Sequence, residues 1–144
     1  MVEVFAKFPL YLKYSLAAAL LLAAASAAGA EKVVCHYTYG GETQLLEALP
    51  VKSPYAVTGI RVGSYFQFRL VFQNEPAGLA AIKVYTYVDR DEGSTLIHQA
   101  SFPYPPAAVA SNSAAAPYGF SGLHFVYEPV RDSELQYWCR METI

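Results

Sequence analysis

Two cysteines and three histidines are the residues of this 144-residue chain best suited to covalent or metal chemistry. Cys35 and Cys139 can form a disulfide, or they can serve as metal ligands or as a redox pair. The chain has no second cysteine pair and no Cys-x-x-Cys spacing. A single structural disulfide is therefore the favoured interpretation. It would close a loop of roughly 100 residues, and the chain-entropy model assigns such a loop on the order of 4–5 kcal/mol.

The histidines form the basis of an alternative interpretation. His36, His98 and His124, together with Met141, are side chains that suit copper. They lack a His-x-His or clustered-methionine spacing. The alternation of residues places His36 and His124 on the polar faces of their strands, opposite the faces that carry Cys35 and Phe125. We therefore interpret the histidines as surface residues and expect no cofactor. If the protein does bind a metal, His36 and His124 are the candidate ligands.

The chain offers no recognisable catalytic motif. It contains no Gly-x-Ser-x-Gly sequence. The acidic turn Asp89–Gly93 is followed by Ser94 and Ala100 where a calcium-binding EF-hand loop needs glycine and glutamate. The spacing of the carboxylates favours no particular pair for acid–base work. We expect a protein that is not an enzyme.

Tyrosine is the most unusual component of the composition. Ten of the twelve tyrosines follow residue 30. Several of them fall on strand faces opposite the expected core, together with basic residues. If the two strands concerned are neighbours, these side chains form one patch. Because tyrosine offers a large contact area and few rotatable bonds, the patch suits contact with a protein or a glycan, unless it is a second buried face. The candidate binding surface consists of Tyr65, Arg69, Lys83, Tyr85 and Tyr87.

Residues 1–30 have the layout of an export signal. Lys7 and Lys13 precede an apolar run, and Ala28-Gly29-Ala30 supplies the small residues before a cleavage site. The uncharged stretch 14–30 is at the short limit for a membrane span, so cleavage is favoured over a retained anchor. We expect a cleaved signal peptide at 1–30, a single domain at 31–144, and a periplasmic or secreted protein without a membrane segment.

The charge of the remaining chain argues against nucleic acid as a partner. Loss of Glu3, Lys7 and Lys13 from 10 basic and 12 acidic residues leaves 8 basic and 11 acidic residues. No basic stripe is present, and nucleic-acid binding normally requires one. No Asn-x-Ser/Thr glycosylation sequence occurs, which fits a periplasmic protein. The oligomeric state is left open.

Alternating apolar and polar residues predict seven or eight antiparallel strands. The alternation is clearest at 65–73, where Phe66, Phe68, Leu70 and Phe72 share one face. Gly40-Gly41 predicts a tight hairpin turn. Further strands are expected at 79–88, 95–102, 123–128 and 134–141, and a long proline-rich loop at 103–117. Short strands at these spacings predict an all-β antiparallel sandwich.

The run Asp132 to Cys139 (DSELQYWC) resembles the Asp-x-x-x-Tyr-x-Cys run of immunoglobulin domains, in which a tyrosine also stands two residues before a cysteine. The likeness covers eight residues, has one residue too many between Asp132 and Tyr137, and lacks the tryptophan of the third strand. It implies a sandwich that is immunoglobulin-like in general shape, without membership of the family.

Three functions follow as hypotheses. The favoured one is an exported binding or accessory module that recognises a protein or an envelope component. The first alternative is a carrier of a metal or small ligand that uses the histidines. The second alternative is an inhibitor of an extracellular enzyme that uses the 103–117 loop as its contact.

Overall fold

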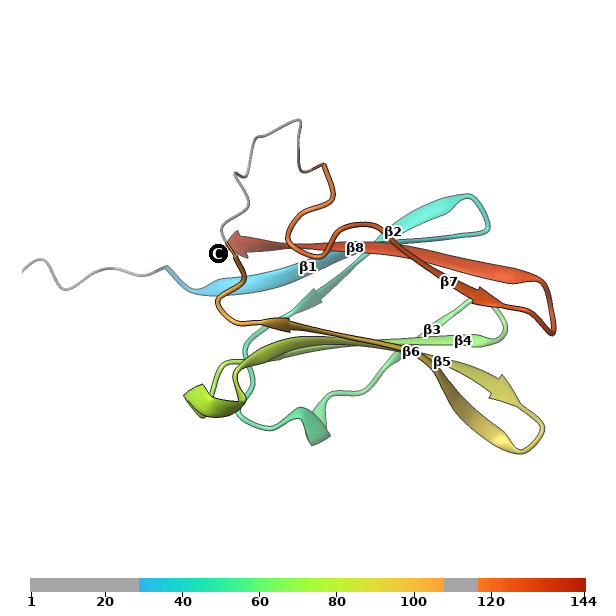
Figure 1. The fold of residues 1–144 in the computed structure, drawn as a ribbon, viewed down its shortest axis with the longest axis horizontal. Helices are drawn as coiled ribbons and strands as arrows, with labels where there is room; N and C mark the ends of the chain where they lie inside the picture. Colours follow the sequence, from blue (N-terminus) through green and yellow to red (C-terminus); the bar gives the residue numbers. More distant parts are fainter. Residues whose placement is uncertain (1–28, 108–116) are drawn as a thin grey trace, which may run out of the picture.

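The computed structural model describes residues 29–107 and 117–144, and shows two four-stranded antiparallel sheets stacked face to face (Figure 1). The prediction of an all-β sandwich is confirmed. Residues 1–28, which hold most of the predicted export signal, and 108–116, which hold most of the proline-rich loop, lie outside the described residues. Within the part of the chain described, no helix has the length and apolar character needed to cross a membrane.

The strands follow one another around the molecule in chain order, and the last strand pairs with the first. The first sheet has the order β2-β1-β8-β7 and the second has the order β3-β4-β5-β6. The strands are β1 (Glu31–Tyr39), β2 (Glu42–Ala48), β3 (Ile60–Val62), β4 (Phe66–Gln73), β5 (Ala81–Arg90), β6 (Gly93–Pro103), β7 (His124–Glu128) and β8 (Ser133–Thr143), with 3-10 turns η2 (Pro54–Ala56) and η3 (Ala77–Leu79).

Gly40 and Gly41 form the predicted hairpin turn between β1 and β2. Their φ angles are 61° and 81°, in the left-handed region that residues with a Cβ rarely adopt. Tyr39 pairs with Glu42 directly across this two-residue turn. The glycine pair therefore sets the register of the whole hairpin.

The core lies between the sheets and is rich in aromatic side chains. Phe68 of β4 packs against Tyr37 and Tyr137 of the opposite sheet, with ring centroids 5.6 and 5.3 Å apart. Full burial of such a side chain contributes about 1.5–3 kcal/mol. The alternation predicted for β5 and β8 is confirmed, and that of β4 holds from Phe66 to Leu70, after which Val71 and Gln73 of its outer face are buried as well. The inner faces of the three strands supply the buried residues Phe66, Phe68, Leu70, Phe72, Ile82, Val84, Val88, Leu135, Tyr137 and Cys139.

Cys35 and Cys139 form a disulfide, as predicted. They are opposite one another on the central strands β1 and β8, with Cα atoms 4.0 Å apart. The bond therefore joins two neighbours within one sheet, whereas the immunoglobulin disulfide joins the two sheets of its sandwich. Both cysteines are fully buried. A buried disulfide is consistent with an oxidising compartment outside the cytosol.

The predicted orientation of β7 is wrong. Phe125 and Tyr127 face outward and are 57% and 54% exposed, while His124, Val126 and Glu128 face the interior. The buried Glu128 carboxylate accepts hydrogen bonds from the backbone N–H groups of Val130 and Arg131. These bonds within the β7–β8 turn satisfy the charged group, and for this reason it can lie inside.

Candidate binding surfaces

The outer face of the second sheet carries most of the predicted binding surface. β4 and β5 are neighbours, and their register places Arg69 opposite Tyr85 and Gln67 opposite Tyr87. The rings of Tyr85 and Tyr87 are stacked with centroids 6.4 Å apart, and the Arg69 guanidinium lies 4.9 Å from the Tyr85 centroid. We name this surface, Gln67, Arg69, Lys83, Tyr85 and Tyr87, the tyrosine face. All five side chains are partly exposed.

Arg69 has a structural task within the tyrosine face. Its guanidinium donates hydrogen bonds to the carbonyl oxygens of Val57 and Pro54, at 2.8 and 2.5 Å. The connection from β2 to β3 is thereby fastened to the outer face of the sheet. Gly59 lies so close to β4 that a Cβ there would be 2.9 Å from the side chain of Gln67. Arg69 therefore holds this connection and the Tyr85 ring in place at the same time.

Lys83 supplies a cation beside the tyrosines. It lies on β5 two residues before Tyr85, opposite Val71 of β4 and Ser101 of β6. Among residues 29–107 and 117–144, no carboxylate forms an ion pair with it. Its ammonium group is thus available to an acceptor on a partner.

Tyr65 does not belong to the tyrosine face. It precedes β4, is 40% exposed, and packs under Arg131 of the β7–β8 turn, whose guanidinium lies 3.8 Å from the ring centroid. The side chain joins the two sheets at one end of the sandwich. The alternation of residues along β4 predicted that Tyr65 lies on the same face as Arg69. A pattern within one strand takes no account of the contact that Arg131 makes from the opposite sheet.

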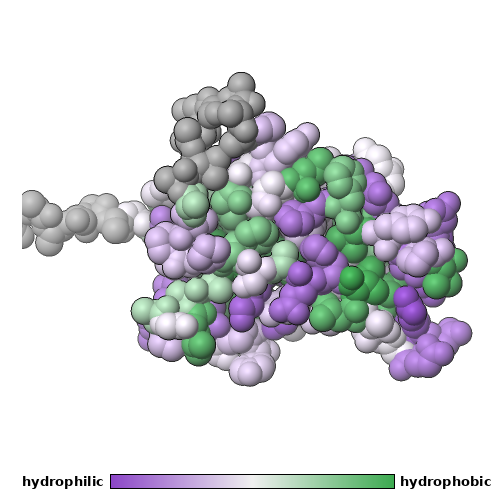
Figure 2. All heavy atoms as spheres, viewed as in Figure 1, coloured by the Kyte–Doolittle hydropathy of each residue, from purple (hydrophilic) through white to green (hydrophobic). Residues whose placement is uncertain are grey.

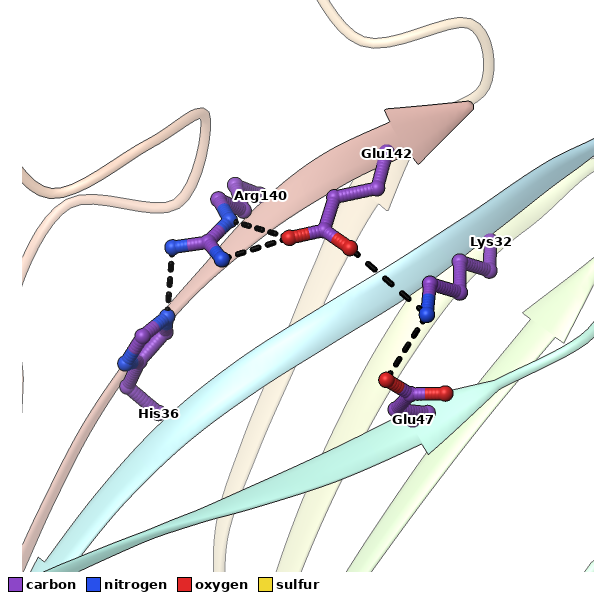
Figure 3. Close-up of polar contacts among 5 residues, drawn as sticks. All are labelled: Lys32, His36, Glu47, Arg140 and Glu142. Atoms are coloured by element: carbon purple, nitrogen blue, oxygen red, sulfur yellow. Dashed lines mark hydrogen bonds and ion pairs between the residues drawn. The ribbon is translucent and has the colours of Figure 1, made fainter. Parts of the chain in front are cut away.

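The outer face of the first sheet carries a polar row that sequence reasoning missed (Figure 3). His36 stacks on Trp138 with ring centroids 4.0 Å apart, and the Arg140 guanidinium donates to His36 Nε2 at 2.7 Å. Glu142 accepts two hydrogen bonds from Arg140 and pairs with Lys32, which also binds Glu47. The predicted disulfide could have indicated part of this row. If Cys35 faces Cys139 on antiparallel strands, then His36 must face Trp138.

The electrostatics of this row oppose protonation of His36. Partial burial lowers its pKa, and the neighbouring Arg140 lowers it further, against a smaller opposing effect of Glu142. The Arg140 guanidinium conversely lowers the pKa of the Glu142 carboxyl group. A neutral His36 accepts the hydrogen bond that Arg140 donates. The imidazole is therefore used in a surface hydrogen-bond network.

The other two histidines lie in the interior at the β6–β7 side. His98 Nε2 lies 2.7 Å from the buried Tyr137 hydroxyl, and the His124 ring stacks on Tyr137 at 4.8 Å. His124 Nε2 donates to the Ser121 carbonyl oxygen at 2.9 Å. The expected surface position of His124 is thus wrong. Its N–H has a backbone acceptor and its ring has an aromatic neighbour, so it can be accommodated inside.

These positions bear on the metal candidates. His36 is on the outer face of the first sheet and His124 is on its inner face. The two residues cannot act together on one ion. Among residues 29–107 and 117–144, no group of three or more His, Cys, Asp or Glu side chains is placed to hold a metal.

A small hollow lies beside the β1–β2 hairpin, with a volume of about 240 Å³. Gly63 at its edge has φ 60°, and a Cβ there would come within 2.2 Å of the Tyr39 ring. None of its lining residues is a histidine; they are Tyr37, Tyr39, Glu42, Gln44, Arg61, Val62 and Gly63. The hollow is therefore unrelated to the histidine carrier hypothesis.

Comparison of the chain with protein-family models, with curated proteins and with solved structures gives no match.

Proposed function

We propose that this protein is an exported, non-catalytic binding module, located in the periplasm or secreted, that recognises a protein or envelope component through the tyrosine face. The observation that carries the proposal is the arrangement of Tyr85 and Tyr87 on β5. Their rings are stacked and partly exposed, and Arg69 holds the first of them. Such preordered aromatic groups bind with little loss of side-chain entropy.

The chemistry of the tyrosine face suits a polar partner with some apolar surface. The two rings supply contact area, their hydroxyl groups supply hydrogen bonds, and Lys83 supplies a positive charge. The buried disulfide supports the export part of the proposal because such bonds persist in oxidising compartments.

The test is a capture experiment with the protein expressed from its full sequence and purified from the envelope fraction. The wild type is compared with Tyr85→Ala/Tyr87→Ala. The matched control is Phe125→Ala/Tyr127→Ala, which removes two exposed aromatic side chains from the other sheet. Mass spectrometry of the bound fraction identifies the partner, and calorimetry with that purified partner measures the affinity.

The proposal expects a partner that the wild type and the control bind alike, and that Tyr85→Ala/Tyr87→Ala binds at least tenfold more weakly. Each substituted protein must first show the thermal unfolding transition of a folded domain. Equal binding by all three proteins would exclude the tyrosine face. Binding that is lost only in the control would move the recognition surface to the outer face of β7.

A further inference from the structure

The edge strand β6 differs from the other three edges of the sandwich. It has 11 residues and pairs only with β5, whereas the edge strands β2, β3 and β7 have 7, 3 and 5 residues. Proteins usually keep edge strands short because the exposed backbone groups of a long one can pair with another chain. Here the longest strand of the second sheet lies at its edge.

The outward backbone groups of β6 are available for pairing. Within residues 29–107 and 117–144, backbone hydrogen bonds reach β6 only from β5. In an antiparallel edge strand, roughly half of the peptide groups point away from the sheet. Water or another strand must satisfy those groups.

β6 also lacks the charges that protect an edge. No Lys, Arg, Asp or Glu occurs between Gly93 and Pro103. By contrast, β2 carries Glu42 and Glu47, and β3 carries Arg61. A charged residue on an edge opposes pairing with a second strand. A register shift opposite Thr86/Tyr87 leaves His98–Phe102 as an uninterrupted pairing stretch at the second half of β6.

The inner side chains of this stretch are incompletely covered. His98, Ala100 and Phe102 are partly buried, and Phe102 packs on the core. Figure 1 views the sandwich from the side on which β6 and β7 lie in front, and Figure 2 shows apolar residues interleaved with polar ones over that side. A strand added beside β6 would bury more of this apolar surface.

We propose that β6 is the docking edge for a second copy of this chain. The two β6 strands pair antiparallel about a twofold axis at Ala100 and join two four-stranded sheets into one of eight strands. Such an axis places His98 opposite Phe102 of the second copy and Gln99 opposite Ser101, with Ala100 facing itself. These are an aromatic pair, a hydrogen-bonding pair and a small residue at the centre.

Charge argues for a second copy as the occupant. In a twofold pair of identical strands, a charge near the axis meets a like charge, which is unfavourable. The uncharged β6 avoids this contact. Pairing over His98–Phe102 leaves Asp91 and Glu92, which precede the strand, outside the paired stretch. Because a single strand pair forms a small interface, the dimer belongs to the weak class.

Sedimentation equilibrium tests this directly with protein expressed from the full sequence and purified in its folded form. Gln99→Lys/Ser101→Lys places lysines on two exposed positions of β6 that would face each other across the axis. Thr43→Lys/Leu45→Lys places lysines on two exposed positions of β2 and is the matched control. Between roughly 1 μM and several hundred μM, the wild type and the control should double in mass, and the β6 variant should remain at one chain.

Amide hydrogen exchange of the wild type gives a second readout that needs no substitution. Raising the protein concentration should slow exchange in 98–102 and leave β2 and β3 unchanged. A wild type that stays at one chain in this range overturns the proposal, as does a folded β6 variant that dimerises like the wild type. Slowing in another strand instead of β6 would also overturn it. The dimer is independent of the proposed function, so either can fail alone.

Discussion

His98 and Tyr137 are joined by a 2.7 Å contact between Nε2 and the hydroxyl group, across the interior from β6 of one sheet to β8 of the other. Burial raises the pKa of the Tyr137 hydroxyl well above its usual range, so that it stays protonated. A neutral His98 can then accept its hydrogen bond at Nε2. Protonation of His98 would turn Nε2 into a donor and leave the tyrosine proton without this acceptor.

The first prediction concerns pH. Burial lowers the pKa of His98 below 6.5, and the neighbouring His124 ring lowers it further. The titratable groups known to face His98 are His124 on β7 and Tyr137 on β8. The unfolded chain therefore binds a proton near pH 6.5 while the folded protein does not. The contribution of His98 to stability is complete above pH 6.5 and is lost as the pH falls from there toward its folded pKa.

Urea unfolding at pH 7.5 and pH 5 measures this loss. The free energy of unfolding should be smaller at pH 5. His98→Gln keeps a polar side chain next to Tyr137 but does not titrate, so it should lose less stability over the same interval. Since the pKa of His36 is also lowered, some pH dependence should remain in the variant. Identical losses in both proteins would contradict a role for His98.

The second prediction separates the hydroxyl of Tyr137 from its ring. Tyr137→Phe removes the contact with His98 but keeps the stack on His124 and the packing on Phe68. It should lower the free energy of unfolding by about 1 kcal/mol. Tyr137→Ala removes the ring as well and should cost about 3–5 kcal/mol. Chemical denaturation measures both, and an equal loss in the two variants would show that the ring contributes nothing.

The strands could be predicted where alternation and core packing agree. Along β4, the apolar residues Phe66, Phe68, Leu70 and Phe72 face the core, so the period of two was sufficient. Along β7, the same reasoning selected the wrong face. Phe125 and Tyr127 are more apolar than His124 and Glu128, but the latter pair finds hydrogen-bond partners inside. Those partners depend on neighbouring turns, which a period along one strand does not describe.

The candidate binding surface was also predicted only in part, because some of its contacts come from residues far away in the sequence. The pairing of β4 with β5 could be expected from their short connection, and it brings Arg69, Lys83, Tyr85 and Tyr87 together. Tyr65 was misplaced because its partner, Arg131, is 66 positions away in the sequence. The use of Arg69 to hold the β2–β3 connection is likewise a long-range contact.

The third prediction concerns Gly119, which lies beside the disulfide. A Cβ at this position would be 2.1 Å from the Cys139 carbonyl oxygen, and the residue has φ 57°. Its neighbour Phe120 donates a backbone hydrogen bond to the same oxygen. Gly119→Ala should therefore disrupt the contact between this segment and β8. A residue with a Cβ in the left-handed conformation costs roughly 1–2 kcal/mol, and the loss of stability should exceed that cost.

Gly122→Ala is the matched control for that substitution. Gly122 has φ 73°, but a Cβ there would meet nothing within 4 Å. It should therefore show the backbone cost without the clash. Thermal unfolding of the two variants gives the comparison. Equal melting temperatures would mean that the segment around Gly119 can move away from Cys139 without any loss of stability.

The fourth prediction concerns the disulfide itself. Cys35 and Cys139 are separated by 104 positions and are fully buried between neighbours that are already paired in the sheet. The bond constrains the unfolded chain far more than the folded one, so its loss should lower stability by about 4–5 kcal/mol on the chain-entropy model. Because both sulfur atoms lie inside, a thiol reductant should react slowly with the folded protein and quickly once urea unfolds it. Thiol titration over time, with and without urea, measures the two rates. The melting temperature of the reduced and alkylated protein measures the stability, and an unchanged melting temperature would show that β1 and β8 hold together equally well without the bond.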